Sequence, residues 1–260
     1  MSAILFDLDK AGVATLTLNR PERHNSFDDA STTEFMAHLD RCVNDHTVRL
    51  VCIRANGRNF CAGADVGSLP GKDAEPSSSK GAPSLLAMLR RLNQLTLPSV
   101  ALVQGACVGG GAALVACCDV AIAERSAYLA ISEVRLGIPP VALVPYFAAA
   151  IGVRHTRRYA LSGEKIDAQR CLDIGFVHEI CDQGGLSAAA SPIVEAFLRG
   201  GPLAIGRTKA AALLLAPPEM SPEEEAVFLE RMKETIASPE AVEGISAFLE
   251  KRAPRWFKEV

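Results

Sequence analysis

The sequence predicts a mixed α/β fold that ends in a helical region, and two observations support this class. Short runs of alternating or β-rich residues are interleaved with helix-like apolar stripes over the first part of the chain. After about Glu133, helix signals dominate to the end. The chain has 260 residues, 49% of them apolar and 22% charged, which suits a globular protein with one sizeable core.

The N-terminal part predicts a hairpin followed by a helix. Residues 4–8 and 13–18 alternate apolar and polar side chains around Lys10-Ala11-Gly12, which is typical of two strands joined by a tight turn. Ser26, with Asp29 three residues later, is expected to cap the first helix. The apolar stripe of this helix is expected to consist of Phe35, Leu39 and Cys42.

The middle of the chain predicts further strands and one more helix. A Leu-rich helix is expected at residues 84–95, and strand–strand–helix units recur. Residues 67–83 are rich in Gly, Pro, Ser and Lys, which is typical of a mobile loop, and such loops often cover a site. The strands are expected at residues 49–55, 99–103, 119–123 and 128–131.

Several helices are expected in the second part of the chain. Pro139-Pro140 opens the first helical stretch, Ser221 and Glu224 form a capping box, and Ser238-Pro239 repeats the cap. A helical tail that cannot bury its apolar face alone often buries it against another subunit. The last helix, at about 239–251, is expected to bury Val242, Ile245 and Phe248.

The composition argues against several classes of protein. A net charge of −3 with scattered Lys and Arg argues against nucleic-acid binding. The chain has no apolar run of the length needed to span a membrane, and its N-terminus lacks the features of a signal peptide. The eight cysteines form no CxxC pair and the five histidines show no metal-ligand spacing. We therefore expect a cytoplasmic protein with reduced, buried thiols and no metal.

Three stretches could carry chemistry. Residues 59–65 place small residues around a glycine, and residues 105–111 end in three consecutive glycines before an apolar run, where free N–H groups could stabilise an oxyanion. Glu133 has apolar neighbours that could raise its pKa for proton transfer near neutral pH. Taken singly, each has a plainer interpretation: close packing of helix on strand, or a surface glutamate paired with Arg135.

The order of these stretches along the chain favours a functional role over the plainer interpretations. Residues 18–26, 59–65, 105–111 with Cys118-Asp119, and 133–139 follow one another in an order and spacing that resemble the enoyl-CoA hydratase/isomerase (crotonase) family. The likeness extends over nearly the whole chain, through to Arg252.

The resemblance implies a crotonase-like spiral of strand–strand–helix units with a C-terminal helical oligomerisation region. Residues 1–198 would form the spiral core with the acyl-CoA site, and residues 199–260 the trimerisation region. The expected partners are an acyl-CoA substrate and copies of the same chain, in a homotrimer or a hexamer built as a dimer of trimers. No cofactor is expected beyond the coenzyme A of the substrate.

The resemblance also assigns roles to individual residues. The backbone N–H groups of Ala64 and Gly110 would form an oxyanion hole for the thioester oxygen, and Glu133 would be the catalytic acid–base. Backbone around Ala62 would receive the adenine, and Arg23 would lie near the CoA phosphates. The other substrate- or CoA-binding positions that it implies are Gly63, Asp65, Gly109, Ala113, Phe248 and Lys251, the last two reaching the CoA of a neighbouring subunit.

One departure from the family pattern bears on the reaction. Two-glutamate hydratases of the family carry a first glutamate at the position of Ala113, whereas the second is retained as Glu133. The stretch Glu133-Val134-Arg135-Leu136-Gly137 is similar to bacterial hydratases of methylglutaconyl-type, branched acyl-CoA esters. We therefore expect hydration of an α,β-unsaturated acyl-CoA. Isomerisation by a single glutamate and a catalytically silent acyl-CoA-binding paralogue remain as alternatives.

Overall fold

The structure, a computed structural model, describes residues 2–65, 84–215 and 219–257. The predicted mobile loop at 67–83 lies outside the described residues. None of the helices within the described ranges combines the length and apolar character needed to cross a membrane.

The larger sheet has six strands in the described part of the chain, in the order β1-β2-β3-β4-β6-β9. β1 and β2 form the predicted antiparallel hairpin, and all the other neighbours are parallel. The strands are β1 (Ile4–Leu8), β2 (Val13–Leu18), β3 (Leu50–Ala55), β4 (Ser99–Val103), β6 (Val120–Glu124) and β9 (Glu179–Cys181).

A smaller sheet pairs three short strands in the order β5-β7-β8. These are β5 (Ala106–Val108), β7 (Tyr128–Ala130) and β8 (Ile166–Asp167). The chain passes from β4 in the large sheet to β5 in the small one and then into a helix, and it repeats this path from β6 to β7. The strand–strand–helix units expected from the sequence are therefore confirmed, and these two units each span both sheets.

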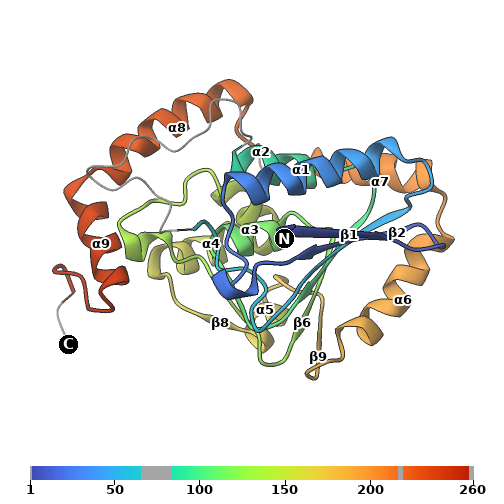
Figure 1. Cartoon of the computed structure of the whole chain (residues 1–260), viewed down its shortest axis with the longest axis horizontal. Coiled ribbons are helices and arrows are strands. Elements are labelled where there is room, and N and C mark those ends of the chain that lie inside the picture. The colour runs from blue at the N-terminus through green and yellow to red at the C-terminus, as the bar shows by residue number, and fades with distance from the viewer. Residues whose placement is uncertain (1, 66–83, 216–218, 258–260) are drawn as a thin grey trace.

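Helices cover both faces of the large sheet (Figure 1). Val51 and Ile53 of β3 belong to the main core with the first two helices, whereas Leu50 and Cys52 pack on the opposite face against α6. Burial on both faces is the reason why the parallel strands are apolar at nearly every position. The α-helices are α1 (Asp29–Asn44), α2 (Leu85–Asn93), α3 (Gly110–Ala116), α4 (Val144–Ser162), α5 (Ala168–Asp173), α6 (Leu186–Arg199), α7 (Pro202–Leu213), α8 (Pro222–Ile236) and α9 (Pro239–Leu249).

The C-terminal helices α8 and α9 extend from the body of the molecule as an arm, drawn in orange to red in Figure 1. The predicted caps of both helices are confirmed: Ser221 and Glu224 form the capping box of α8, and Ser238 caps α9. The boundary expected between a core at 1–198 and a separate trimerisation region stays a prediction.

Three details of the predicted helices were wrong. The N-cap of α1 is Asp28, in a capping box with Ser31, because the hydroxyl of Ser26 instead donates to the carbonyl of Arg23. The helix expected at Pro139-Pro140 begins only at Val144, after a turn at 141–143.

In α9 the fully buried residues are Ala241, Gly244 and Ala247. Of the predicted stripe, Val242 is half-buried and Ile245 packs partly buried against this cluster, while Phe248 is exposed. The second half of the chain also contains β8 and β9, which the helix signals concealed.

Candidate functional site

The loop at residues 59–65 lies between two backbone neighbours. Cys61 N–H donates to the carbonyl of Ala106 at 3.1 Å, and Val108 N–H donates to the carbonyl of Cys61 at 2.9 Å, so the loop pairs with β5. On its other side, Phe27 N–H donates to the carbonyl of Gly63 at 2.8 Å. In a trans peptide the C=O and N–H point in opposite directions. The N–H of Ala64 therefore points away from Phe27, and within the described residues it has no acceptor.

The glycine turn at residues 109–111 provides the second donor. Gly109 has φ +57, a conformation that side chains other than glycine rarely adopt, and it precedes the first turn of α3. Its carbonyl accepts from Ala113 N–H at 3.0 Å, so the N–H of Gly110 on the same peptide points out of the helix start. The N–H of Gly110 has no acceptor among the residues that the structure describes.

The two donor segments touch each other. A Cβ atom placed on Gly63 would lie 3.3 Å from the backbone nitrogen of Gly110, and one placed on Gly110 would lie 3.8 Å from Cα of Gly63. The loop that carries Ala64 and the turn that carries Gly110 are thus adjacent, although they are separated by more than 40 residues in the sequence. Leu85, at the start of α2, packs over the same turn, with Cδ2 2.7 Å from the Cβ position of Gly110.

The carboxylate of Glu133 lies against this turn. Glu133 opens the 3-10 helix η3 (Glu133–Leu136), two residues after β7, and its Oε1 lies 2.7 Å from the Cβ position of Gly109. Its Oε2 is buried and has no hydrogen-bond partner among the described residues. Burial raises the pKa of Glu133 to about 7, an effect that backbone hydrogen bonds from Ser132 and Glu133 oppose. A group with this pKa can both accept and donate a proton at neutral pH.

The last helix supports the turn that carries Glu133. A Cβ atom on Gly244 of α9 would lie 2.5 Å from the carbonyl carbon of Leu136, and one on Gly137 would lie 2.9 Å from the carbonyl of Glu240. The backbones of α9 and η3 therefore meet without side chains between them. This close approach explains why the buried stripe of α9 consists of small residues.

Two of the predicted CoA-binding residues form an ion pair. Arg23 Nη1 lies 3.0 Å from Asp65 Oδ2, with the arginine side chain 60% exposed and the aspartate 15% exposed. Ala62 lies beside them, because its N–H donates to the carbonyl of His24 at 3.0 Å. Arg23, Ala62 and Asp65 are thus brought together next to Ala64.

The remaining predicted positions lie in two places. Ala113 is completely buried in α3, where its side chain offers only a methyl group. Phe248 and Lys251 are exposed at the C-terminal end of α9, and within the described residues no hydrogen bond, ion pair or ring contact links them to Ala64, Gly110 or Glu133. Their predicted role concerns a neighbouring subunit.

Sequence reasoning did not identify two contacts that support the site. Asn25 is buried, and its side-chain amide joins Arg20 to the carbonyls of Asn56 and Asn59. Glu225 of α8 forms an ion pair with Arg90 of α2 at 2.6 Å and accepts a hydrogen bond from Ser84, the N-cap of α2. Asn25 stands in a stretch that the sequence singled out, but its partners become visible only in the fold.

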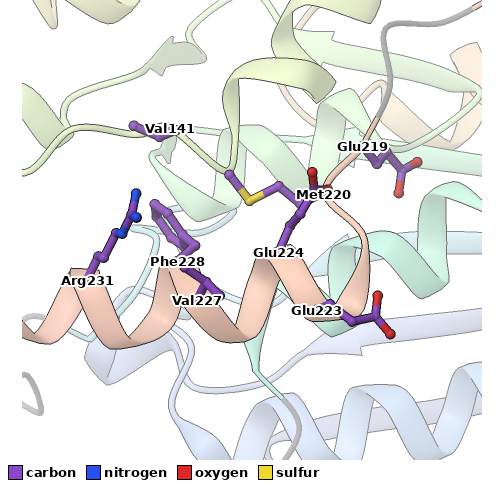
Figure 2. Close-up of a pocket in the computed structure, with 8 residues that line it drawn as sticks. All are labelled: Val141, Glu219, Met220, Glu223, Glu224, Val227, Phe228 and Arg231. Carbon is purple, nitrogen blue, oxygen red and sulfur yellow. The ribbon is translucent and has the colours of Figure 1, made fainter.

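A cavity of about 640 Å³ lies beside α8, between this helix and Val141 (Figure 2). The side chain of Phe228 and the guanidinium of Arg231 point from α8 toward Val141, whereas Glu219 and Glu223 point away (Figure 2). The residues that line the cavity are Val141, Glu219, Met220, Glu223, Glu224, Val227, Phe228 and Arg231. None of them belongs to the cluster of Ala64, Gly110 and Glu133.

The chain is similar to known proteins over nearly its whole length. The family description “Enoyl-CoA hydratase/isomerase” matches residues 9–259 of the chain. The chain is 31% identical to the 2,3-dehydroadipyl-CoA hydratase of Escherichia coli, over 93% of this chain and 94% of the relative. It is 28% identical to the mitochondrial Delta(3,5)-Delta(2,4)-dienoyl-CoA isomerase of Dictyostelium discoideum, over 95% of this chain and 88% of the relative.

A solved structure of an enoyl-CoA hydratase from Shewanella pealeana superposes with a TM-score of 0.77 at 33% identity, over 98% of this chain and 96% of that one. The family match spans nearly the whole sequence, and the fold agrees with it. The chain therefore belongs to the enoyl-CoA hydratase/isomerase family.

Proposed function

We propose that the protein hydrates an α,β-unsaturated acyl-CoA. In this proposal the N–H groups of Ala64 and Gly110 bind the thioester oxygen, and Glu133 is the single acid–base. The observation that carries it is the meeting of two backbone donors, which have no acceptor among the described residues, with a buried carboxylate whose pKa is raised to about 7.

The two donors would act on the charge that develops during the reaction. Addition of water to C3 moves electrons through C2 to the thioester oxygen, which becomes an enolate. Two converging N–H groups bind an enolate oxygen more strongly than the neutral carbonyl, and one such donor is worth about 3 kcal/mol in other enzymes. Both donors belong to backbone that other hydrogen bonds hold in place, so little reorganisation is needed.

Glu133 would carry the proton through both halves of the addition. As the water oxygen bonds to C3, a water proton passes to the carboxylate. The carboxyl group then delivers a proton to C2 of the enolate, which restores the carbonyl and gives the 3-hydroxyacyl-CoA. The pKa of about 7 suits both transfers, because acid and base forms are then present in similar amounts at neutral pH.

Isomerisation is the second candidate, and the residue at position 113 favours it. With Ala113 in place of a second carboxylate, Glu133 could take a proton from one carbon of an enoyl chain and return it to another without water. The likeness to a dienoyl-CoA isomerase agrees with this chemistry. We favour hydration because the sequence from Glu133 to Gly137 resembles single-glutamate hydratases, which act on branched acyl-CoA esters.

The coenzyme A part of the substrate is proposed to bind beside Ala64. Arg23 is exposed enough to meet a phosphate, and Asp65 holds the arginine near the loop. Backbone at Ala62 and Gly63 would receive the adenine, and Gly109 would line the thioester. No cofactor is proposed beyond the CoA of the substrate.

The test is a panel of short, long and branched 2-enoyl- and 3-enoyl-CoA thioesters. Loss of the conjugated-thioester absorbance with a 2-enoyl substrate supports hydration, and gain of that absorbance with a 3-enoyl substrate supports isomerisation. Tight thioester binding with neither change, across the panel, would show a silent acyl-CoA-binding protein and would refute the proposal. Glu133→Gln should lose the conversion, and the exposed Glu234→Gln is the matched control.

We also propose that the chain forms a homotrimer or a dimer of trimers in the cytoplasm. The C-terminal region leaves large apolar side chains exposed in one chain, among them Leu203, Leu214, Leu215, Phe248 and Leu249. A surface of this kind is typical of a subunit interface. Sedimentation should show the trimer or hexamer, and a stable monomer at micromolar concentration would contradict the role given to this region.

A further inference from the structure

We propose that Asn25 is a positioning residue, which sets the direction of the Ala64 N–H through the carbonyls of the 56–59 loop and the thiol of Cys61. The inference rests on the proposed function, because it concerns the oxyanion donor of that site. It does not depend on whether the reaction is hydration or isomerisation.

The amide of Asn25 makes three hydrogen bonds while it is buried. Its Oδ1 accepts from the N–H of Arg20 at 2.8 Å, and its Nδ2 donates to the carbonyls of Asn56 and Asn59, both at 2.9 Å. The residue has φ +55, in the left-handed region that asparagine tolerates better than most residues. A side chain with one acceptor and two donors is required to join these three backbone groups.

The backbone of Asn25 adds a fourth connection, through Cys61. The thiol of Cys61 donates to the carbonyl of Asn25 at 3.1 Å and accepts from the N–H of Gly63 at 3.4 Å. Cys61 is completely buried, and burial raises its pKa to about 12, so the group remains a thiol with its proton available to donate. Asn25 is thus connected to the residue that precedes Ala64.

The segment around Asn25 runs alongside the whole donor loop. The carbonyl of His24 accepts from Ala62, and Phe27 pairs with the residues on both sides of Ala64. The side chain of Asn25 bonds to the start of the loop at Asn59, and its carbonyl bonds to the middle of the loop at Cys61. The peptide that bears the Ala64 N–H is therefore located by residues 24–27, and the amide of Asn25 fixes their distance from the loop.

A displaced donor should affect the transition state more than substrate binding. Misplacement of a catalytic group by about 1 Å can cost about 100-fold in rate. Binding of CoA depends on other contacts, so KM should change little. A residue that only stabilised the fold would lower the amount of folded protein without changing the properties of the folded site.

The experiment compares Asn25→Asp with Asn56→Ala. In Asn25→Asp the two donors are replaced by an oxygen that faces two carbonyl oxygens. Among the described residues, the side chain of Asn56 bonds only to Asn19, away from the donor loop. The first readout is kcat and KM on the substrate that the wild-type protein converts. The second is the absorbance of bound 4-(dimethylamino)cinnamoyl-CoA, whose band moves to longer wavelength when donors polarise the thioester carbonyl.

We expect Asn25→Asp to lower kcat by about 10- to 100-fold with KM within about threefold, and to reduce the red shift of the bound chromophore. Asn56→Ala should keep the kcat and the red shift of the wild-type protein. Cys61→Ala should reduce the red shift in the same way, and Cys61→Ser, which keeps a donor and an acceptor, should restore most of it. If Asn25→Asp does not fold, the comparison of Cys61→Ala with Cys61→Ser tests the positioning role.

The two proposals fail in different ways. If the wild-type protein binds the chromophore without a red shift and converts no substrate, the proposed function is wrong. If the wild-type red shift is present and a folded Asn25→Asp or Cys61→Ala keeps it together with wild-type kcat, the positioning role is wrong.

Discussion

Replacement of Glu133 by glutamine should inactivate the protein and stabilise it at the same time. Glutamine has nearly the same shape but neither gives up nor takes up a proton. General acid–base catalysis contributes roughly 100- to 10,000-fold, so kcat should fall by that factor, which corresponds to about 3–5 kcal/mol. The affinity for CoA thioesters should be kept, because glutamine preserves the shape of the side chain and leaves the ion pair of the predicted CoA residues Arg23 and Asp65 unchanged.

The stability change follows from the raised pKa. Burial raises the pKa of Glu133 from an ordinary 4.5 to about 7 in the folded chain. Between these pH values the folded chain holds a proton that the unfolded chain has lost, so the free energy of unfolding falls as the pH rises through this window. The total loss is about 3 kcal/mol, and it is complete above pH 7. Glutamine stays neutral, so the variant should escape this loss.

The assay is urea unfolding followed by circular dichroism at pH 5 and pH 8. It is carried out at one fixed protein concentration, because subunit association also stabilises the folded chain. We expect Glu133→Gln to exceed the wild-type protein by less than about 1 kcal/mol at pH 5 and by up to about 3 kcal/mol at pH 8. The exposed Glu234→Gln should follow the wild-type curve at both pH values.

A Glu133→Gln variant that is equally or less stable than the wild-type protein at pH 8 would refute the claim that burial of Glu133 disfavours its charged form. Retention of wild-type kcat would refute its role as proton carrier.

Three further outcomes are expected. The kcat/KM of the wild-type protein should rise with pH through about 7, because the carboxylate form of Glu133 must start the reaction; a profile that is flat from pH 5 to 9 would contradict this. Gly109→Ala should reduce kcat strongly, since its Cβ would lie 2.7 Å from Glu133 Oε1 and its φ of +57 disfavours alanine; a folded variant with unchanged turnover would show that the carboxylate works elsewhere. Arg90→Met should lower the free energy of unfolding, measured by urea titration, by about 3–5 kcal/mol, because Glu225 would be left buried without its cation. The exposed Arg199→Ala should have no such effect in the same titration.

The sheet could be predicted from the sequence because its signal is local. The alternation around Lys10-Ala11-Gly12 and the apolar runs of the parallel strands depend on which face each residue buries. The cap at Ser26 was wrong because residues 24–27 are occupied by tertiary hydrogen bonds to the donor loop, so the helix begins after Asp28. The stripe of α9 was wrong because helix patterns give weight to large apolar residues, whereas this helix approaches η3 through Gly244.

The site, like the sheet, could be predicted in part. The segments that carry Ala64, Gly110 and Glu133 could be recognised because their order resembles a family, and the structure brings them together. The roles of these residues remain proposals. The hydrogen bonds of Asn25 could not be predicted, because Asn56 and Asn59 come close to Asn25 only after β2 and β3 have paired.

The contact between α9 and η3 links the end of the chain to its chemistry. Because backbone meets backbone at Gly244 and Leu136, a movement of α9 has no intervening side chain that could absorb it. A chain shortened before residue 239 would lose the wall behind the Glu133 turn, and water could then reach the carboxylate from that side. The acidity of Glu133 would return toward that of an ordinary glutamate, although its immediate neighbours in the sequence were unchanged.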